Sequence, residues 1–334
     1  AKLNRKIQIV ACTDKQIERA EKYAKYFKGA KAFSDYTEMI NATQLDAVYL
    51  AVPHFLHYPI MKDLLNHNLN ILCEKPITTT LEDANHIVQL AEEKNLKVGI
   101  NYQYRYDKAC YRMVMAARNN ELGELYYGIC NIPWHRTDKY FNNSPWHKSI
   151  SQSGGGTLLT QGSHALDILL WAFNSKPIKV SAVTRNYKFK DVEVEDTAIG
   201  YIELENNKVI SITSSMANAK DQPITIDLYG EKGSIHYTSN RSLKIKKAKI
   251  RHYRPSSKGI HALARSLNAY TDWVLNDTPY LCTAKDSLQV LECIEMMYKD
   301  SKSENIKIQL NVDNYKNALK DICDNYLSSR NEES

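Results

Sequence analysis

The sequence predicts an α/β protein with two domains. The first is a doubly wound, parallel, dinucleotide-binding (Rossmann-like) domain, and the second is an α+β domain with a large, mostly antiparallel open sheet. In the first third of the chain, short apolar runs alternate with helical patterns, which is typical of parallel strands joined by helical crossovers. Beyond it, apolar runs follow one another with turn signals between them, which indicates antiparallel hairpins. We place the domains at residues 1–122 and 123–334.

Length and composition agree with a globular protein of this size. The chain has 334 residues, of which 43% are hydrophobic and 25% are charged. We see no run of eighteen or so apolar residues and no leader pattern, so we expect a cytoplasmic protein without a membrane partner. The seven cysteines are scattered and form no Cys-x-x-Cys pair, which argues for reduced thiols and against a metal site.

The first strand and helix indicate a nucleotide cofactor. An apolar run over residues 6–14 ends on Asp14, and a helical pattern follows over residues 16–27. A strand that ends in an acid before a helix presents a carboxylate to the adenosine ribose of a dinucleotide. Asp14 favours NAD, because a carboxylate repels the 2′-phosphate of NADP, whereas the neighbouring Lys15 is compatible with NADP.

A strand that ends in this way is normally the second strand of its fold. The first strand and its G-x-G-x-x-G turn, which holds the pyrophosphate, should precede it by about twenty residues. No such motif occurs in the sequence, which opens on Ala1. We therefore expect the dinucleotide-binding domain to be N-terminally incomplete.

Three more strands end at one rim of the predicted parallel sheet. They cover residues 45–54, 70–76 and 97–101, and helices are expected at residues 58–68 and 80–94. Two of the strands stop at a proline, which cannot donate a ladder hydrogen bond. This rim is where open α/β sheets bind ligands, and a lysine held there by proline can exchange a proton at a fixed point. The rim carries Asp14, Pro53, His54, Glu74, Lys75, Pro76 and Asn101.

The second domain is predicted as runs of strands with a few helices. The strands are expected at residues 125–132, 178–183, 197–204, 208–215, 224–229, 233–237 and 243–250. The helices are expected at residues 107–119, 261–275, 284–301 and 313–327. Residues 241–258 hold eight Lys or Arg residues and no acid, which could attract phosphates. Because Leu243 and Ile245 alternate with Lys244 and Lys246, we favour a strand whose lysines prevent edge pairing, and we do not expect nucleic-acid binding.

A glycine-led helix carries the other candidate side chains. After Gly154-Gly155-Gly156, one face presents a hydroxyl, an imidazole and a carboxylate from Thr160, His164 and Asp167. The three glycines leave bare backbone against which a ligand can lie. Asp167 is one turn from His164 and can orient its ring, as acid/base chemistry needs. The alternative is a purely structural histidine.

Several of these motifs, in this order, resemble the Gfo/Idh/MocA family of NAD(P)-dependent sugar oxidoreductases. The matching pieces are residues 10–14, residues 46–53 with His57, residues 74–76, Asn101 with Arg105, residues 154–167, and Thr278-Pro279. The resemblance implies hydride transfer between nicotinamide and a sugar carbon, a cis Lys75-Pro76 bond, and a homodimer or homotetramer that buries the outer face of the second sheet. The cofactor-binding residues that we expect are Asp14, Lys15, Pro53, His54, His57, Glu74, Lys75 and Asn101.

The resemblance also implies the roles of Lys75 and His164, which would assist and relay the hydroxyl proton. A free lysine, with a pKa of about 10.4, is a poor base, but burial and a positive nicotinamide ring would both lower that pKa. Many members of the family carry Asp where this chain has Thr160. Threonine cannot act as a base, so we expect Lys75 and His164 to carry the proton chemistry.

Substrate binding is assigned to Arg136, Tyr140, Trp146, Thr160 and Asp167. The stretch around the first three resembles members that act on nucleotide-linked amino sugars or uronic acids, since basic and aromatic groups suit a diphosphate and a base. The same aromatics could instead pack the domain interface. Two alternatives stay open: a dehydrogenase of free sugars or inositol-type polyols, and a non-catalytic relative that only binds a ligand.

Overall fold

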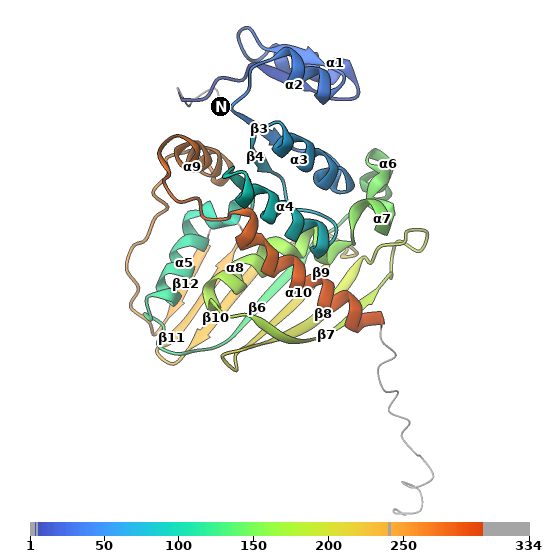
Figure 1. The fold of residues 1–334 in the computed structure, drawn as a ribbon. Helices are drawn as coiled ribbons and strands as arrows, with labels where there is room; N and C mark the ends of the chain where they lie inside the picture. Colours follow the sequence, from blue (N-terminus) through green and yellow to red (C-terminus); the bar gives the residue numbers. More distant parts are fainter. Residues whose placement is uncertain (1–3, 5, 240–241, 303–334) are drawn as a thin grey trace, which may run out of the picture. The chain divides into compact units, whose positions relative to one another are not determined.

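The computed structural model describes residue 4, residues 6–239 and residues 242–302 (Figure 1). The described residues up to Asp300 form one compact unit. The helix expected at residues 313–327 lies outside the described residues. The elements below keep their order along the chain and are labelled in Figure 1.

The first part of the chain has the Rossmann-like alternation of strands and helices, with all its strand pairs parallel. The strands are β1 (Ala11–Thr13), β2 (Lys31–Phe33), β3 (Ala47–Leu50), β4 (Asn70–Cys73) and β5 (Val98–Ile100). The helices are α1 (Ile17–Ala24), α2 (Tyr36–Ala42), α3 (His57–Asn66) and α4 (Leu81–Glu93). The strands form two sheets, β1-β2 and β3-β4-β5. The fold class is confirmed, with two differences: the parallel strands form two sheets and not one, and β2 and α2 have no counterpart among the predicted elements.

Local capping explains where the predicted helices begin. The Thr80 side chain accepts a hydrogen bond from the N–H of Asp83, so α4 begins one residue later. The Asp107 side chain does the same for α5 (Lys108–Arg118), accepting from the N–H groups of Ala109 and Cys110. Each cap satisfies backbone donors that have no partner within the first turn.

The second part contains a seven-stranded sheet in the order β12-β11-β10-β6-β9-β8-β7. Its strands are β6 (Leu125–Pro133), β7 (Pro177–Arg185), β8 (Thr197–Leu204), β9 (Val209–Ser215), β10 (Thr225–Gly230), β11 (Gly233–Thr238) and β12 (Ser242–Lys246). All neighbours are antiparallel except β6 and β9, as predicted for a mostly antiparallel sheet. β12 is an edge strand with Lys244 and Lys246 exposed, which confirms the edge-strand interpretation for Ser242–Lys246, although the strand ends at Lys246 and not at residue 250.

Helices cover one face of this sheet (Figure 1). They are α5, α8 (Ser163–Phe173) and α10 (Ala284–Lys302). The contact is close: a Cβ at Gly128 of β6 would lie 2.9 Å from Leu169 and Phe173 of α8, and one at Gly200 of β8 would lie 2.6 Å from Met297 of α10. The apolar core therefore lies between the sheet and these helices.

The segment after the second sheet returns to the edge of β5. Helix α9 (Ala262–Asn276) precedes Cys282, whose carbonyl accepts a hydrogen bond from the N–H of Ile100 at 2.9 Å. The Ser266 hydroxyl donates to Asn101 at 2.8 Å. This return brings residues from late in the chain to the rim that carries the candidate side chains.

Candidate functional site

The ends of β3, β4 and β5 bring several rim residues together. Glu74 Oε1 accepts hydrogen bonds from the Tyr49 hydroxyl and from Asn101 Nδ2, the latter at 2.7 Å. Asn101 is 1% exposed, and its Oδ1 accepts from Ser266. The Glu74 carboxylate is thus fixed from two neighbouring strands, and Asn101 acts as a support for Glu74.

Lys75 follows Glu74, and the Lys75-Pro76 peptide bond is cis, as the resemblance implies. Lys75 Nζ donates a hydrogen bond to the main-chain carbonyl of Thr160. Burial lowers the pKa of Lys75 from 10.5 to about 8, against the opposing charge of Glu74. A sizeable fraction of this side chain is therefore the neutral amine near physiological pH.

The carbonyl that meets Lys75 comes from an irregular turn of helix. Residues Leu158–Gly162 form a π-helical turn that leads into α8. Such turns break the regular pattern of helical hydrogen bonds and are frequent at functional sites. The Thr160 hydroxyl donates to the Gly156 carbonyl at 2.7 Å, so it is the main chain of Thr160 that faces the lysine.

The His164 ring is held by two aromatic neighbours. It stacks on Tyr104, with ring centroids 5.0 Å apart, and meets Tyr102 edge-on at 5.7 Å. Its Nδ1 is buried and has no hydrogen-bond partner among the described residues. Burial, and then the charge of Lys75, lower the pKa of His164 well below 6.5, so the ring is neutral and a weaker base than a free imidazole.

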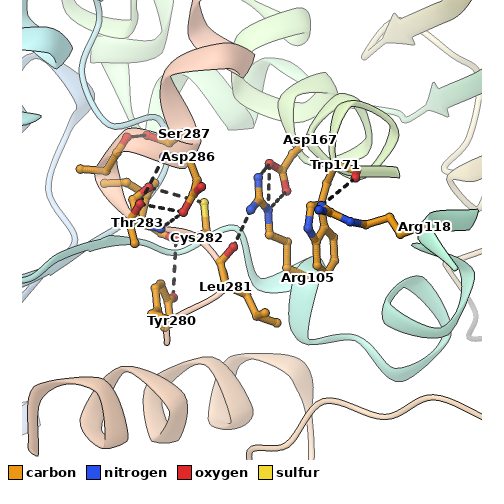
Figure 2. Close-up of polar contacts among 12 residues, drawn as sticks. Arg105, Arg118, Asp167, Trp171, Tyr280, Leu281, Cys282, Thr283, Asp286 and Ser287 are labelled. Carbon is orange, nitrogen blue, oxygen red and sulfur yellow. Dashed lines mark hydrogen bonds and ion pairs between the residues drawn. The ribbon is translucent and has the colours of Figure 1, made fainter. Parts of the chain in front are cut away.

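The expectation that Asp167 orients His164 is wrong. Both oxygens of Asp167 accept hydrogen bonds from Arg105, at 2.7 to 3.1 Å (Figure 2). Arg105 also donates to the carbonyl of Leu281 and lies over the Trp171 ring at 5.2 Å. The Asp167 carboxylate is 0% exposed and is paired with the Arg105 guanidinium, so Asp167 is also not available to bind a substrate.

The expectation that the three glycines leave bare backbone for a ligand is also wrong. A Cβ at Gly156 would lie 1.9 Å from the carbonyl oxygen of Glu195, and one at Gly155 would lie 2.2 Å from the Tyr298 hydroxyl. Protein atoms thus already occupy the space beside these glycines. The glycines allow Glu195 and Tyr298 to approach the start of the helix.

Two rim histidines are engaged by the main chain. Both ring nitrogens of His57 face carbonyl oxygens, those of Pro76 at 2.7 Å and Val52 at 3.0 Å, and the residue is 0% exposed. His57 therefore links the segment after β3 to the segment after β4, each of which contains a proline. His54 follows Pro53, and its Nδ1 lies 2.8 Å from the Ser153 carbonyl.

The three aromatic and basic candidates lie in one stack. The Arg136 guanidinium covers the Trp134 ring at 4.7 Å and the Tyr140 ring at 5.8 Å. The stack continues through His147 to Trp146, whose ring meets His54 edge-on at 4.6 Å. The structure thus brings Arg136, Tyr140 and Trp146 together and joins them to the rim through His54. Burial lowers the pKa of His147 to about 4, and Lys75 adds to the effect.

The adenosine end of the predicted cofactor site lies at the end of β1. The N–H of Asp14 donates to the Phe33 carbonyl, and one Asp14 oxygen accepts from the N–H of Gln16 at 2.9 Å. The other oxygen has no partner in the described part of the chain and suits a ribose hydroxyl. Lys15 is exposed beside it. The residues present therefore fit a dinucleotide at its ribose end and at the Lys75 rim, while a G-x-G-x-x-G turn does not occur in the sequence.

The described residues contain neither a candidate membrane-spanning helix nor a candidate metal site. None of their helices is long and apolar enough to cross a membrane. No group of three or more His, Cys, Asp or Glu side chains gathers there in an arrangement that could hold a metal ion.

Comparison with protein families decides the relationship. Residues 1–102 match the model of the oxidoreductase family with an NAD-binding Rossmann fold, and residues 112–236 match the GFO/IDH/MocA C-terminal domain, which together cover more than half of the chain. The chain belongs to the Gfo/Idh/MocA family. The resemblance that the motifs suggested is thereby confirmed.

One curated relative of this Gfo/Idh/MocA protein is the glucose-6-phosphate 3-dehydrogenase of Bacillus subtilis (strain 168). The two proteins are 27% identical over 69% of this chain and 67% of the relative. The chain spans about two thirds of the length of the curated relatives that it matches first.

Solved structures share its fold at low identity. A WlbA dehydrogenase from Bordetella pertussis, in complex with NADH and UDP-GlcNAcA, has a TM-score of 0.77 at 22% identity, covering 89% of this chain and 88% of that one. Levoglucosan dehydrogenase, in complex with NADH and levoglucosan, has a TM-score of 0.78 at 19% identity and covers 89% of each chain.

Proposed function

We propose that this Gfo/Idh/MocA protein is an NAD(P)-dependent oxidoreductase that transfers a hydride to or from a CH–OH carbon of a sugar. One observation carries the proposal: Lys75 is a strand-end lysine with a pKa lowered to about 8, held against a main-chain carbonyl. A general base works best when its pKa is near the pH at which it operates. We assign Lys75 and His164 as the acid/base pair.

Oxidation of the alcohol requires the loss of a proton and a hydride from the same CH–OH group. NAD(P)⁺, when bound, supplies the hydride acceptor. Lys75, as the neutral amine, takes the hydroxyl proton while the C–O single bond becomes a carbonyl. His164 would relay the proton from Lys75 outward, and because its pKa lies below that of Lys75 it would hold the proton only in passing. Reduction runs in reverse and needs protonated Lys75.

We assign the cofactor to the rim of the parallel strands. Asp14 would bind the adenosine ribose and favour NAD over NADP, and Glu74 and Lys75 would lie at the nicotinamide end. Pro53 and His54 shape the rim between these ends, while His57 and Asn101 support it from behind, because both are buried and hydrogen-bonded.

For the substrate we favour a nucleotide-linked sugar. The stack that includes Arg136, Tyr140 and Trp146 offers a guanidinium and flat rings, which suit a diphosphate and a base. The named ligand of the WlbA relative, UDP-GlcNAcA, agrees with this choice. A free sugar or polyol is the alternative, since other relatives are named as glucose-6-phosphate 3-dehydrogenase and inositol 2-dehydrogenase.

The first test is a titration with NADH and NADPH, followed by nicotinamide fluorescence. Binding of NADH in preference to NADPH is the expected result. Thermal protection by UDP-sugars, and turnover of one of them, would then support the nucleotide-sugar substrate, whereas protection by inositol or a hexose alone would favour the alternative. If neither cofactor binds, the oxidoreductase proposal fails for this chain.

A lysine variant separates an enzyme from a non-catalytic relative. We expect Lys75→Ala to lower turnover by roughly a hundredfold to ten-thousandfold and to keep its fold. Lys62→Ala, at an exposed position on α3, is the matched control and should behave as the wild type. Oxidation by the wild type should fall as the pH drops below about 8, and reduction should fall above it. A wild type without turnover on any sugar tested would favour the binding protein.

We also propose that the outer face of the seven-stranded sheet joins copies of this chain into a homodimer or homotetramer. Five side chains on neighbouring strands of that face are 38% to 53% exposed: Tyr127, Val183, Ile199, Tyr201 and Val209. An exposed apolar patch of this kind is typical of an interface. Light scattering should show an oligomer that Ile199→Asp dissociates, while Ile260→Asp, in a loop after β12, leaves it intact.

A further inference from the structure

Glu195 is a buried carboxylate outside the predicted site. It lies just before β8 and is 7% exposed. Its Oε2 accepts a hydrogen bond from the N–H of Gly156 at 2.8 Å, and its Oε1 accepts from the N–H of Leu158 at 2.8 Å and from the Tyr298 hydroxyl at 2.9 Å. Burial raises the pKa of Glu195, and these donors oppose the rise. All three donors are uncharged, so the carboxylate does not form an ion pair with them.

Glu195 accepts hydrogen bonds from three consecutive N–H groups at the start of the helix. In addition to its two side-chain bonds, its main-chain carbonyl accepts from the N–H of Thr157 at 3.0 Å. The first N–H groups of a helix have no partner within the helix, so whatever binds them fixes where the helix begins. One residue therefore fixes the position of residues 156–158.

The same short segment presents the carbonyl that meets Lys75. The N–H of Thr160 donates to the Gly156 carbonyl at 2.9 Å, and the Thr160 carbonyl accepts from Lys75 Nζ. Gly155 and Gly156 have no side chains that would keep Tyr298 and Glu195 away. A continuous set of hydrogen bonds therefore runs from Tyr298 through Glu195 and the backbone of residues 156–160 to Lys75.

We propose that Glu195 is a positioning residue for Lys75, which it holds through the backbone of residues 156–160. The inference rests on the proposed function in one respect, which is the assignment of Lys75 as an acid/base group. A carbonyl that accepts a hydrogen bond from Lys75 favours the protonated lysine. When the Thr160 carbonyl is held less firmly and its hydrogen bond with Lys75 weakens, the pKa of Lys75 should therefore fall further below its ordinary value.

The test measures the titration of Lys75 in the cofactor-free full chain. Acetic anhydride acetylates the neutral amine, and peptide mass spectrometry follows the acetylation of Lys75 against pH. In Glu195→Gln the amide nitrogen would face one of the backbone N–H groups and lose that bond. We expect the midpoint for Lys75 to fall by roughly one pH unit, a tenfold change in proton affinity. Tyr298→Phe removes one donor and should shift the midpoint less, in the same direction.

The controls separate this effect from general loosening. Glu205→Gln, at an exposed position after the other end of β8, should leave the midpoint unchanged. The titratable groups that face Lys75 are Glu74, His54, His147 and His164, and none of them is altered in these variants. Circular dichroism and the melting temperature report whether each variant is folded. If Glu195→Gln does not fold, Tyr298→Phe decides the question.

An unchanged Lys75 midpoint in folded Glu195→Gln would overturn the proposal. If the midpoint shifts as expected but no sugar is turned over by the wild type, the positioning role stands and the proposed function fails. With an active wild type, Glu195→Gln should lower kcat by roughly tenfold to a hundredfold, leave KM for the cofactor unchanged, and move the acidic limb of oxidation to lower pH.

Discussion

Residues 156–173 form a bend at Gly156 followed by one continuous helical segment, and the two halves of this stretch are held in different ways. The first half, up to Gly162, contains the π-helical turn and binds Glu195 and Lys75 through its main chain. The second half, α8, is apolar over most of its surface and almost entirely buried. Its one buried carboxylate, Asp167, pairs with Arg105 (Figure 2).

The difference teaches how one continuous segment separates stability from chemistry. Hydrogen bonds made by the main chain leave the Thr160 carbonyl at a defined point, where it can influence the proton of Lys75. Apolar packing holds α8 against the sheet, and the Asp167–Arg105 ion pair ties it to the turn Gln103–Tyr106 after β5. Loss of the Asp167–Arg105 ion pair should therefore alter the free energy of unfolding, and changes to the main-chain hydrogen bonds of the first half should alter the titration of Lys75.

Removal of the Arg105 guanidinium should have the largest effect on stability. Arg105→Met leaves the Asp167 carboxylate buried without its cation, which should lower the free energy of unfolding by roughly 3–5 kcal/mol. Urea denaturation measures the loss. Arg118→Met, at an exposed arginine that donates to the Trp171 carbonyl at 3.4 Å, is the control and should change stability by less than about 0.5 kcal/mol. A cost below about 1 kcal/mol for Arg105→Met would mean that α8 is held by packing alone.

Loss of the Lys75 ammonium should stabilise the protein while it removes turnover. The folded-state pKa of about 8 is below the ordinary 10.5, so folding penalises the protonated lysine, most strongly below pH 8. The penalty fades as the pH rises from 8 towards 10.5. Lys75→Met should therefore raise the free energy of unfolding at pH 7 by up to about 3 kcal/mol and by less at pH 10. Thermal denaturation at both pH values measures this, with Lys62→Met as control. An equal gain at both would contradict the lowered pKa.

Gly156→Ala should disturb the first half by steric overlap. The added Cβ would lie 1.9 Å from the Glu195 carbonyl oxygen, so Glu195 or the helix start must move. We expect a loss of about 1–3 kcal/mol of stability and a fall in the Lys75 titration midpoint. Gly162→Ala is the matched control, because its Cβ would meet atoms no nearer than 3.3 Å. If both alanines cost the same, the close approach of Glu195 is not what requires glycine.

Local signals explain which parts of the fold were predictable. Thr80 and Asp107 are helix-capping residues, and they indicate where α4 and α5 begin. The alternation of Lys244 and Lys246 with apolar residues indicates the edge strand β12. The strand β2 was missed, because the three residues Lys31–Phe33 are too few to show a period. Turn and cap chemistry can be recognised in sequence, whereas a short strand depends on its neighbours.

The candidate site was predictable where residues are adjacent in sequence and not where partners are distant. Lys75 was identified from the proline beside it. The partner of Asp167, however, is Arg105, which is 62 residues away. The partner of Gly156 is Glu195, which is 39 residues away. Helical spacing alone favoured His164 as the partner of Asp167, since nothing local shows which long-range charge will reach a buried carboxylate.

The smallest expected effect is that of the Thr160 hydroxyl, and it tests whether main chain or side chain governs Lys75. Thr160→Val keeps the branched shape but loses the hydrogen bond to the Gly156 carbonyl, which should cost about 1 kcal/mol of stability. The Lys75 titration midpoint should stay where it is, because Lys75 contacts the Thr160 carbonyl. Thr160→Ser, which keeps the hydroxyl, is the control for stability. If Thr160→Val shifts the midpoint as far as Glu195→Gln does, the Thr160 side chain controls the lysine, and the main-chain path from Glu195 loses its support.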